Sequence, residues 1–346
     1  MIWVDLDNTP HVPLFRPILI ELERRNVQSF VTSRQHAQTE DLLQFWKIPH
    51  LTVGSHGGKN KIRKLANLAR RSTQLISAAH GKPLKLAMSH GSRTHMVAAW
   101  WLRIPYLVMN DYEYSEMHIA SLLATHLLFP SYIPESRLVD RGIPLRKVIR
   151  YEGYKEQVYL KDFAPDRDFR HSIDIPEDKV LITMRPPSMS ANYHDKRSER
   201  LFTEALAGFA GHDSTLCLIV NRAEAERRLV PENLLREGKV RFLDRAVDGL
   251  QLLWSSDIVV SGGGTMNREA ALMGIPTYSV FTGPRPAADE LLQKEGRLTF
   301  VESREQARSI AVNKRPAGTI YKPENTGLAS WIADLMIDLA NHPPKS

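Results

Sequence analysis

The chain has 346 residues, of which 42% are hydrophobic and 25% charged, a composition that is typical of globular proteins and excludes a disordered chain. Its length exceeds the roughly 250–300 residues at which a single core stops growing, so we expect two domains. The 46 basic and 39 acidic residues give a net charge of +7, which favours an anionic partner.

The N-terminal residues are not predicted to form a signal peptide. They lack the basic segment and apolar stretch of a signal peptide, and no run in the chain approaches the roughly 18 apolar residues that span a bilayer. The single cysteine, Cys217, excludes an intrachain disulfide and lies in an apolar run typical of a core. We therefore expect a cytoplasmic protein.

Short apolar runs alternate with amphipathic stretches through the first 150 residues. The runs predict strands at 2–5, 29–32, 51–53, 84–88, 106–109 and 127–129, and the stretches predict helices at 12–25, 38–46, 61–79 and 94–103. Strands that alternate with helices predict βαβ units in a parallel sheet. The pattern pauses over residues 150–175, which are polar and turn-like, and we place the interdomain linker there.

The alternation resumes after the linker. It predicts strands at 180–184, 216–220, 240–243, 258–260 and 277–280, with helices at 200–209, 223–236, 247–254, 266–273 and 326–342. We expect an N-terminal domain over residues 1–165, a second domain over 175–325 and a C-terminal helix within 326–346. Both domains are expected to be Rossmann-like α/β units.

Basic residues crowd the segment 59–71, where apolar residues recur at helical spacing. A basic amphipathic helix suits anionic lipid headgroups, so peripheral contact with the inner membrane face is one interpretation. The alternative is the solvated outer face of an ordinary helix. Nucleic acid is not expected as a partner, because the basic residues lack interleaved aromatics and no helix-turn-helix or zinc pattern is present.

A glycine run follows the strand predicted at 258–260. Gly262, Gly263, Gly264 and Thr265 lead from that strand into a helix, where glycines allow close backbone approach and the helix start offers free N–H groups for phosphate. Glu269 lies one turn further on, where its carboxylate can accept hydrogen bonds from ribose hydroxyls. The alternative interpretation is a tight turn that serves packing alone.

The run from Ser261 to Pro276 resembles the signature of GT-B glycosyltransferases and of UDP-N-acetylglucosamine 2-epimerases, in which a glycine loop, a helix-borne Glu and a closing Gly-x-Pro bind the nucleotide sugar. The whole chain resembles, more narrowly, an archaeal and bacterial family of uncharacterised predicted glycosyltransferases. The matching pieces are Thr9-Pro10-His11-Val12, Ser89-His90-Gly91-Ser92, Gly153-Tyr154-Lys155-Glu156, Arg185, Ala191-Asn192-Tyr193-His194 and the glycine run.

This resemblance implies a GT-B-like α/β fold, in which two Rossmann-like domains with parallel sheets face a central cleft and the final helix packs back on the N-terminal domain. It implies transfer of a sugar from a nucleotide diphosphate sugar, with a UDP-sugar favoured. We expect neither a metal nor a cofactor, because no His, Cys or Asp cluster has convincing metal-ligand spacing. The acceptor is not identified, and lipid-linked and polysaccharide acceptors are the classes considered.

Several polar residues follow predicted strands of the first half. His11 follows the first strand, as in many GT-B enzymes, and an imidazole suits the role of a base that activates an acceptor hydroxyl. Asp111 and Glu113 follow a later strand and are further catalytic candidates, while Ser92 opens a helix at an anion-friendly turn. Where the epimerases carry a catalytic Asp this chain has Ser92, which weighs against epimerisation.

Two candidates belong to the second half. Arg185 ends the strand predicted at 180–184, where a guanidinium can neutralise a diphosphate leaving group. His194 belongs to one of the family-like pieces and is a further candidate for substrate binding.

Three other functions remain open. Asp5-Leu6-Asp7-Asn8-Thr9 matches the nucleophile motif of haloacid-dehalogenase-type phosphatases, in which the first Asp attacks phosphorus beside Mg²⁺. The late strand that should supply an acidic pair for that metal ends instead in glycines. An epimerase or hydrolase of the same nucleotide sugar, or a non-catalytic nucleotide-binding module, would use the glycine run equally well.

Overall fold

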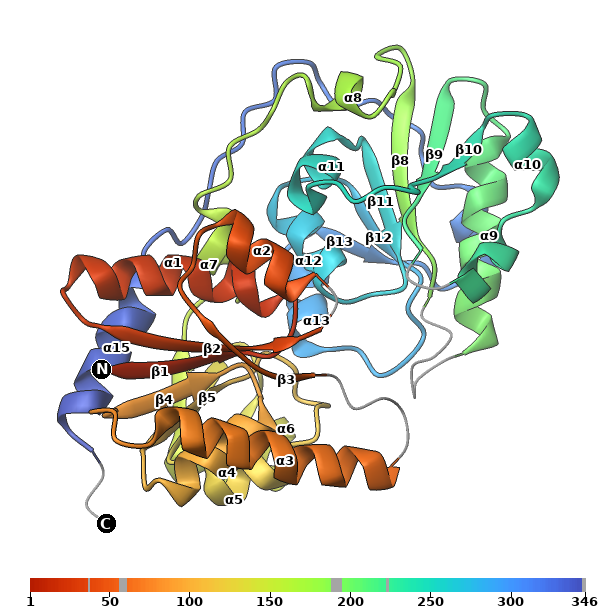
Figure 1. Ribbon diagram of the computed structural model, residues 1–346. Helices are drawn as coiled ribbons and strands as arrows, with labels where there is room; N and C mark the ends of the chain where they lie inside the picture. The colour runs from red at the N-terminus through yellow and green to blue at the C-terminus, as the bar shows by residue number, and fades with distance from the viewer. Residues whose placement is uncertain (37, 56–60, 188–194, 222–223, 344–346) are drawn as a thin grey trace. The chain divides into compact units, whose positions relative to one another are not determined.

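The computed structural model describes residues 1–36, 38–55, 61–187, 195–221 and 224–343. The chain divides into two compact units, Met1–Lys161 with Glu324–Ser346, and Asp162–Pro323. Each unit has its own parallel sheet with helices on both faces, so the predicted α/β class with two Rossmann-like domains is confirmed (Figure 1). No helix in the described ranges is both long enough and apolar enough to cross a membrane.

The sheet of unit 1 has seven strands in the order β3-β2-β1-β4-β5-β6-β7, all parallel. The strands are β1 (Ile2–Leu6), β2 (Ser29–Gln35), β3 (Leu51–Ser55), β4 (Leu86–Ser89), β5 (Tyr106–Met109), β6 (His126–Pro130) and β7 (Val148–Tyr151). Its central strands are buried on both faces, as a parallel sheet covered by helices requires.

Helices of unit 1 form two layers. One contains α1 (His11–Arg24), α2 (Thr39–Phe45), α7 (Gln157–Leu160) and α15 (Leu328–Asn341), and the other contains α3 (Lys61–Ala79), α4 (Arg93–Trp101) and α5 (His118–Leu123) (Figure 1). Two short elements, α6 (Glu135–Val139) and η1 (Leu145–Lys147), precede β7. The final helix α15 packs on α1, where Arg25 donates to Asp334 at 2.7 Å and to Ser330 at 2.7 Å.

The sheet of unit 2 repeats the plan with six parallel strands in the order β10-β9-β8-β11-β12-β13. The strands are β8 (Val180–Arg185), β9 (Thr215–Ile219), β10 (Val240–Phe242), β11 (Ile258–Ser261), β12 (Thr277–Ser279) and β13 (Leu298–Phe300). Phe202 and Phe209 of α9 pack on Ile182 and Ile219 in its main core.

Helices again cover both faces of this sheet. The helices α9 (Lys196–Ala210) and α14 (Arg304–Arg308) pack together, and α8 (Phe169–Ser172), α11 (Gly249–Ser255), α12 (Thr265–Leu272) and α13 (Ala287–Lys294) form the second group. Near β10 lie η2 (Glu224–Leu229) and α10 (Glu232–Arg236).

Two sequence-based expectations need correction. The single helix predicted over 223–236 is two short helical segments, because Pro231 lies between them in an extended conformation and lacks the N–H that a continuous helix needs. The segment 150–175, expected to be irregular, begins with the end of β7 and includes α7 and α8. The boundary between the two units in the sequence falls between residues 161 and 162.

Gly208 allows α9 to contact α14. A Cβ added to Gly208 would lie 2.7 Å from the carbonyl oxygen of Arg308 and 3.0 Å from its Cα, and backbone atoms cannot move aside as a side chain can. Helix propensity alone predicts that Gly208→Ala stabilises the protein by about 1 kcal/mol. We expect the opposite sign, a loss of about 1–3 kcal/mol in the free energy of unfolding, measured by urea denaturation.

Gly249→Ala is the matched control, since a Cβ added at the start of α11 meets no atom within 4 Å. We expect this variant to unfold at the wild-type urea concentration or slightly above it. A Gly208→Ala protein as stable as the wild type would contradict the close helix contact.

Candidate functional site

The strand orders define one position in each sheet where ligands of open α/β folds bind. Connections from β1 and β4 run to opposite sides of the unit 1 sheet, and those from β8 and β11 do the same in unit 2. At such a switch point a crevice forms outside the carboxyl ends of the two strands. The candidate residues of the chain follow these four strands or their neighbours.

Histidines follow both switch-point strands of unit 1. His11 begins α1 after β1, and its Nδ1 lies 3.1 Å from the Oδ1 atom of Asp7. His90 follows β4, and the centre of its ring lies 5.1 Å from that of His11. Both side chains are largely but not fully buried. Two adjacent imidazoles therefore lie beyond the carboxyl ends of β1 and β4.

The carboxylate of Asp111 lies between the side chains of His90 and Lys155. Its Oδ1 lies 2.9 Å from Nε2 of His90, and its Oδ2 lies 2.9 Å from Nζ of Lys155, which comes from the loop after β7. Glu156 lies next to that lysine, with 3.9 Å between Oε1 and Nζ. Asp111 is only 2% exposed, so its carboxylate orients His90 and Lys155 rather than facing solvent.

Glu113 is also internal. Its Oε1 accepts a hydrogen bond of 2.8 Å from Arg137 Nη1, and the residue is only 1% exposed. Glu113 was expected among the catalytic residues, and the structure places its carboxyl against a guanidinium instead of at an open surface.

The charges of the cluster shift two pKa values. Burial raises the pKa of Asp7, but the close contact and charge of His11 outweigh this effect and bring that pKa well below its usual range. Burial lowers the pKa of His90, and Lys155 lowers it further, against the opposing effect of the Asp111 carboxylate. His90 is therefore uncharged at neutral pH.

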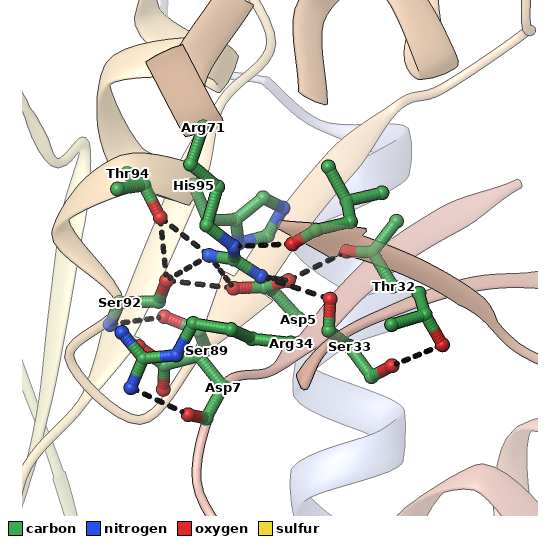
Figure 2. Close-up of polar contacts among 12 residues, drawn as sticks. Asp5, Asp7, Thr32, Ser33, Arg34, Arg71, Ser89, Ser92, Thr94 and His95 are labelled. Atoms are coloured by element: carbon green, nitrogen blue, oxygen red, sulfur yellow. Dashed lines mark hydrogen bonds and ion pairs between the residues drawn. The ribbon is translucent and has the colours of Figure 1, made fainter. Parts of the chain in front are cut away.

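A buried polar network joins residues of β1, β2 and α3 with the loop after β4 (Figure 2). Asp5 is fully buried, and its Oδ1 accepts hydrogen bonds from Thr32 at 2.7 Å and from Arg71 at 2.8 Å. Its Oδ2 accepts from Ser92 at 2.6 Å and from Arg71 at 3.0 Å. Arg71, on α3, outweighs the effect of burial and lowers the pKa of Asp5.

This network corrects three sequence-based interpretations. Asp5 has no free oxygen and no exposed surface, so it cannot be the nucleophile of a phosphatase. Ser92 is fully buried with its hydroxyl on Asp5, so it does not contact substrate. Arg71 is only 4% exposed and faces the sheet, so it is not part of a basic membrane surface formed by residues 59–71.

The glycine run lies at the switch point of unit 2. A Cβ on Gly262 would lie 2.7 Å from the Cα of Pro187, so only glycine allows the loops after β8 and β11 to approach. Gly264 has a φ of +91° and precedes α12 without a side-chain cap. The first N–H groups of α12 thus start at a bare backbone turn, which is a favourable setting for an anion.

Other predicted residues surround this turn. Arg185 ends β8 beside Ser261 and is partly exposed, and Glu269 is partly exposed on α12. Arg268 donates from Nε to Asp289 at 2.8 Å, which fixes α12 against α13 in the interior. His194 lies outside the described residues.

The sequence analysis identified several residues of the candidate site but missed the side chains that contact them. His90 was noted only as part of a turn, although its position after a strand next to β1 is the signal that would have identified it. Lys155 was only a family-like position, and its contact with Asp111 joins segments far apart in the chain. The role of Arg71 had no local signal.

Comparison with known proteins identifies the family but not its activity. The family described as "Protein of unknown function (DUF354)" matches residues 1–312. An uncharacterized protein of Methanocaldococcus jannaschii is 27% identical over 306 residues, which cover 86% of this chain and 86% of that protein.

The fold is shared with solved enzymes at low sequence identity. The UDP-GlcNAc 2-epimerase from Methanocaldococcus jannaschii has a TM-score of 0.72 at 13% identity, covering 97% of this chain and 99% of its own. The UDP-GlcNAc 2-epimerase from Neisseria meningitidis, bound to UDP-GlcNAc, has a TM-score of 0.70 at 16% identity and the same coverage. A glycosyltransferase from Rickettsia africae has a TM-score of 0.57 at 14% identity, covering 98% and 88%.

Arg71 stabilises unit 1 through its buried contacts, and its removal leaves the Asp5 carboxylate buried without a cation. We expect Arg71→Met to lower the free energy of unfolding by about 3–5 kcal/mol, measured by urea denaturation. Arg70→Met is the matched control, because its side chain is exposed on the same helix, and we expect a change within about 0.5 kcal/mol. Equal effects of the two substitutions would contradict the assignment.

Proposed function

We infer the function from the premise that this chain belongs to the family described as "Protein of unknown function (DUF354)". We propose that it transfers a sugar from a nucleotide diphosphate sugar, with a UDP-sugar favoured, to an acceptor hydroxyl. The observation that carries the proposal is the bare glycine turn, which lies at the switch point of the unit 2 sheet and opens directly onto α12.

In this proposal unit 2 binds the donor. The diphosphate contacts the backbone N–H groups of residues 262–265 and the guanidinium of Arg185, and the ribose hydroxyls donate to Glu269. The shared fold of the Neisseria meningitidis epimerase, whose structure holds UDP-GlcNAc, supports this choice of ligand. Arg185 and the helix start balance the charge on the departing diphosphate, so the transfer needs no metal.

Unit 1 supplies the acid–base groups in the same proposal. His11, Asp111 and Glu113 were the catalytic candidates from the sequence, and the first two belong to a connected cluster with His90 and Lys155. A sugar transfer requires a base for the acceptor hydroxyl, and an imidazole held by a carboxylate is a group suited to that step. Within this cluster the Asp111 carboxylate is buried, whereas the side chain of His90 is 19% exposed.

An epimerase or hydrolase of the same nucleotide sugar is the second candidate, because several solved neighbours in fold are epimerases. The burial of Ser92 argues against epimerisation, since the resemblance to the epimerases places a catalytic Asp at that position and here the position faces Asp5. The two functions differ in one measurable respect: a transferase needs an acceptor for efficient release of UDP.

Binding of the donor is tested by thermal shift. We expect UDP-GlcNAc or UDP at about 100 times its Kd to add roughly 2.7 kcal/mol of stability and to raise Tm by about 5 °C. Glu269→Ala should reduce this shift, whereas Glu232→Ala, an exposed substitution on α10, should retain it. If no nucleotide or nucleotide sugar stabilises the wild type, the proposed function fails.

The absence of a metal requirement is tested separately. We expect EDTA to leave both the thermal shift and the release of UDP from UDP-GlcNAc unchanged, because Arg185 and the start of α12 supply the positive charge. Arg185→Met should lower the rate of UDP release, and Arg236→Met on α10 is its control. Activity that appears only with added Mg²⁺ would contradict a metal-independent transfer.

A further inference from the structure

We propose that His90, oriented by Asp111, is the acid–base residue at the carboxyl ends of the unit 1 strands and that its Nδ1 is the reactive atom. This assignment rests on the proposed function and differs from the sequence-based choice of His11 or Asp111 as the base. Three observations carry it: the 2.9 Å contact between His90 Nε2 and Asp111 Oδ1, the partial exposure of the His90 side chain, and the contact of Lys155 with the other Asp111 oxygen.

The tautomer of His90 follows from its partner. Nε2 lies 2.9 Å from Oδ1 of Asp111, whose other oxygen lies 2.9 Å from the ammonium group of Lys155. An ionised carboxylate only accepts hydrogen bonds, so Nε2 carries the proton and donates it. Neutral His90 therefore has its lone pair on Nδ1, and the carboxylate stabilises the imidazolium that forms when Nδ1 takes up a proton.

Nδ1 of His90 is the available atom of this pair. No residue in the described ranges makes a hydrogen bond to it, and 19% of the side chain is exposed at the switch point. Asp111, in contrast, has both oxygens engaged and is 2% exposed. Asp111 is thus the positioning residue, and His90 is the group that meets the substrate.

His11 is less well oriented for the same task. The 3.1 Å contact between its Nδ1 and Asp7 does not meet the angular requirement of a hydrogen bond, and the ring itself is more buried than that of His90. Asp7 is also more exposed than Asp111. His11 packs beside His90, with 5.1 Å between the centres of the two rings.

The step balances with these groups. The acceptor oxygen attacks the anomeric carbon as its proton passes to Nδ1 of His90, and a new carbon–oxygen bond forms. The bond from that carbon to the diphosphate oxygen breaks, and its electron pair leaves with UDP. The imidazolium then releases its proton to solvent, which returns His90 to the neutral form.

The charged groups that face His90 set its working pH. These are Asp111 after β5, Lys155 after β7 and His11 on α1, with Asp7 behind His11 and Glu156 behind Lys155. Burial and Lys155 keep His90 neutral near pH 7, whereas Asp111 favours its charged form. We therefore expect the acid limb of kcat/KM to lie below pH 6.5, to move lower in Asp111→Asn and to move higher in Lys155→Met.

The first experiment measures the reactivity of His90 directly. Diethyl pyrocarbonate modifies unprotonated, accessible imidazoles, and peptide mapping by mass spectrometry gives a rate for each histidine. At pH 7 we expect His90 to react faster than the fully buried His95 and to lose reactivity below pH 6.5, with exposed His118 as the fast reference. A rate for His90 no greater than that of His95 would overturn the proposal.

The second experiment measures UDP release from UDP-GlcNAc with water as the acceptor. His90→Gln should lower kcat/KM by about 10²–10⁴-fold and remove the acid limb, while the nucleotide-induced thermal shift remains. His118→Gln should leave the rate unchanged. The proposal is overturned if His90→Gln keeps the wild-type kcat/KM and an intact acid limb. If the wild type releases no UDP, the rates of His90 modification by diethyl pyrocarbonate test the proposal instead. Failure of every nucleotide to bind would instead contradict the proposed function.

Discussion

One guanidinium holds the carboxyl edge of the unit 1 sheet together. Arg71 extends from α3 and donates to Asp5 at the end of β1, to the Ser33 carbonyl of β2 at 3.2 Å and to the Val53 carbonyl of β3 at 2.8 Å. It also contacts Thr94 at the start of α4. A buried ion pair is favourable only when nearly all its donors and acceptors are used, and this network meets that condition (Figure 2).

The candidate site depends on that network because it lies on the same strand ends. Asp5 pairs in register with Ser89, so the residues that follow β1 and β4 emerge side by side. His11 and His90 are those residues, and acid–base chemistry tolerates little error in position. In unit 2 the strand ends are positioned in a different way. Gly262 allows the loops after β8 and β11 to approach, and the Arg268–Asp289 pair fixes α12 against α13.

The sequence was informative wherever the signal was local. Apolar runs predicted nearly every central strand, and the glycine run together with Glu269 was recognisable because its residues are consecutive or one helical turn apart. Short edge elements such as β7, β13 and α13 escaped prediction, since they have few residues and their burial depends on neighbours far away in the chain. The helix predicted over 223–236 overlooked the effect of Pro231.

The carboxylates show most clearly why local sequence patterns could not predict the role of each residue. Asp5 belongs to a motif that elsewhere marks a nucleophile, yet the structure pairs it with Arg71, which lies 66 residues further along the chain. Glu113 pairs with Arg137 over 24 residues, and Asp111 pairs with Lys155. A carboxylate paired in this way positions other groups and no longer acts as a free base. In our proposal the acid–base role therefore belongs to an imidazole, and His90 is preferred to His11 because Asp111 contacts Nε2 of His90 and leaves its Nδ1 available.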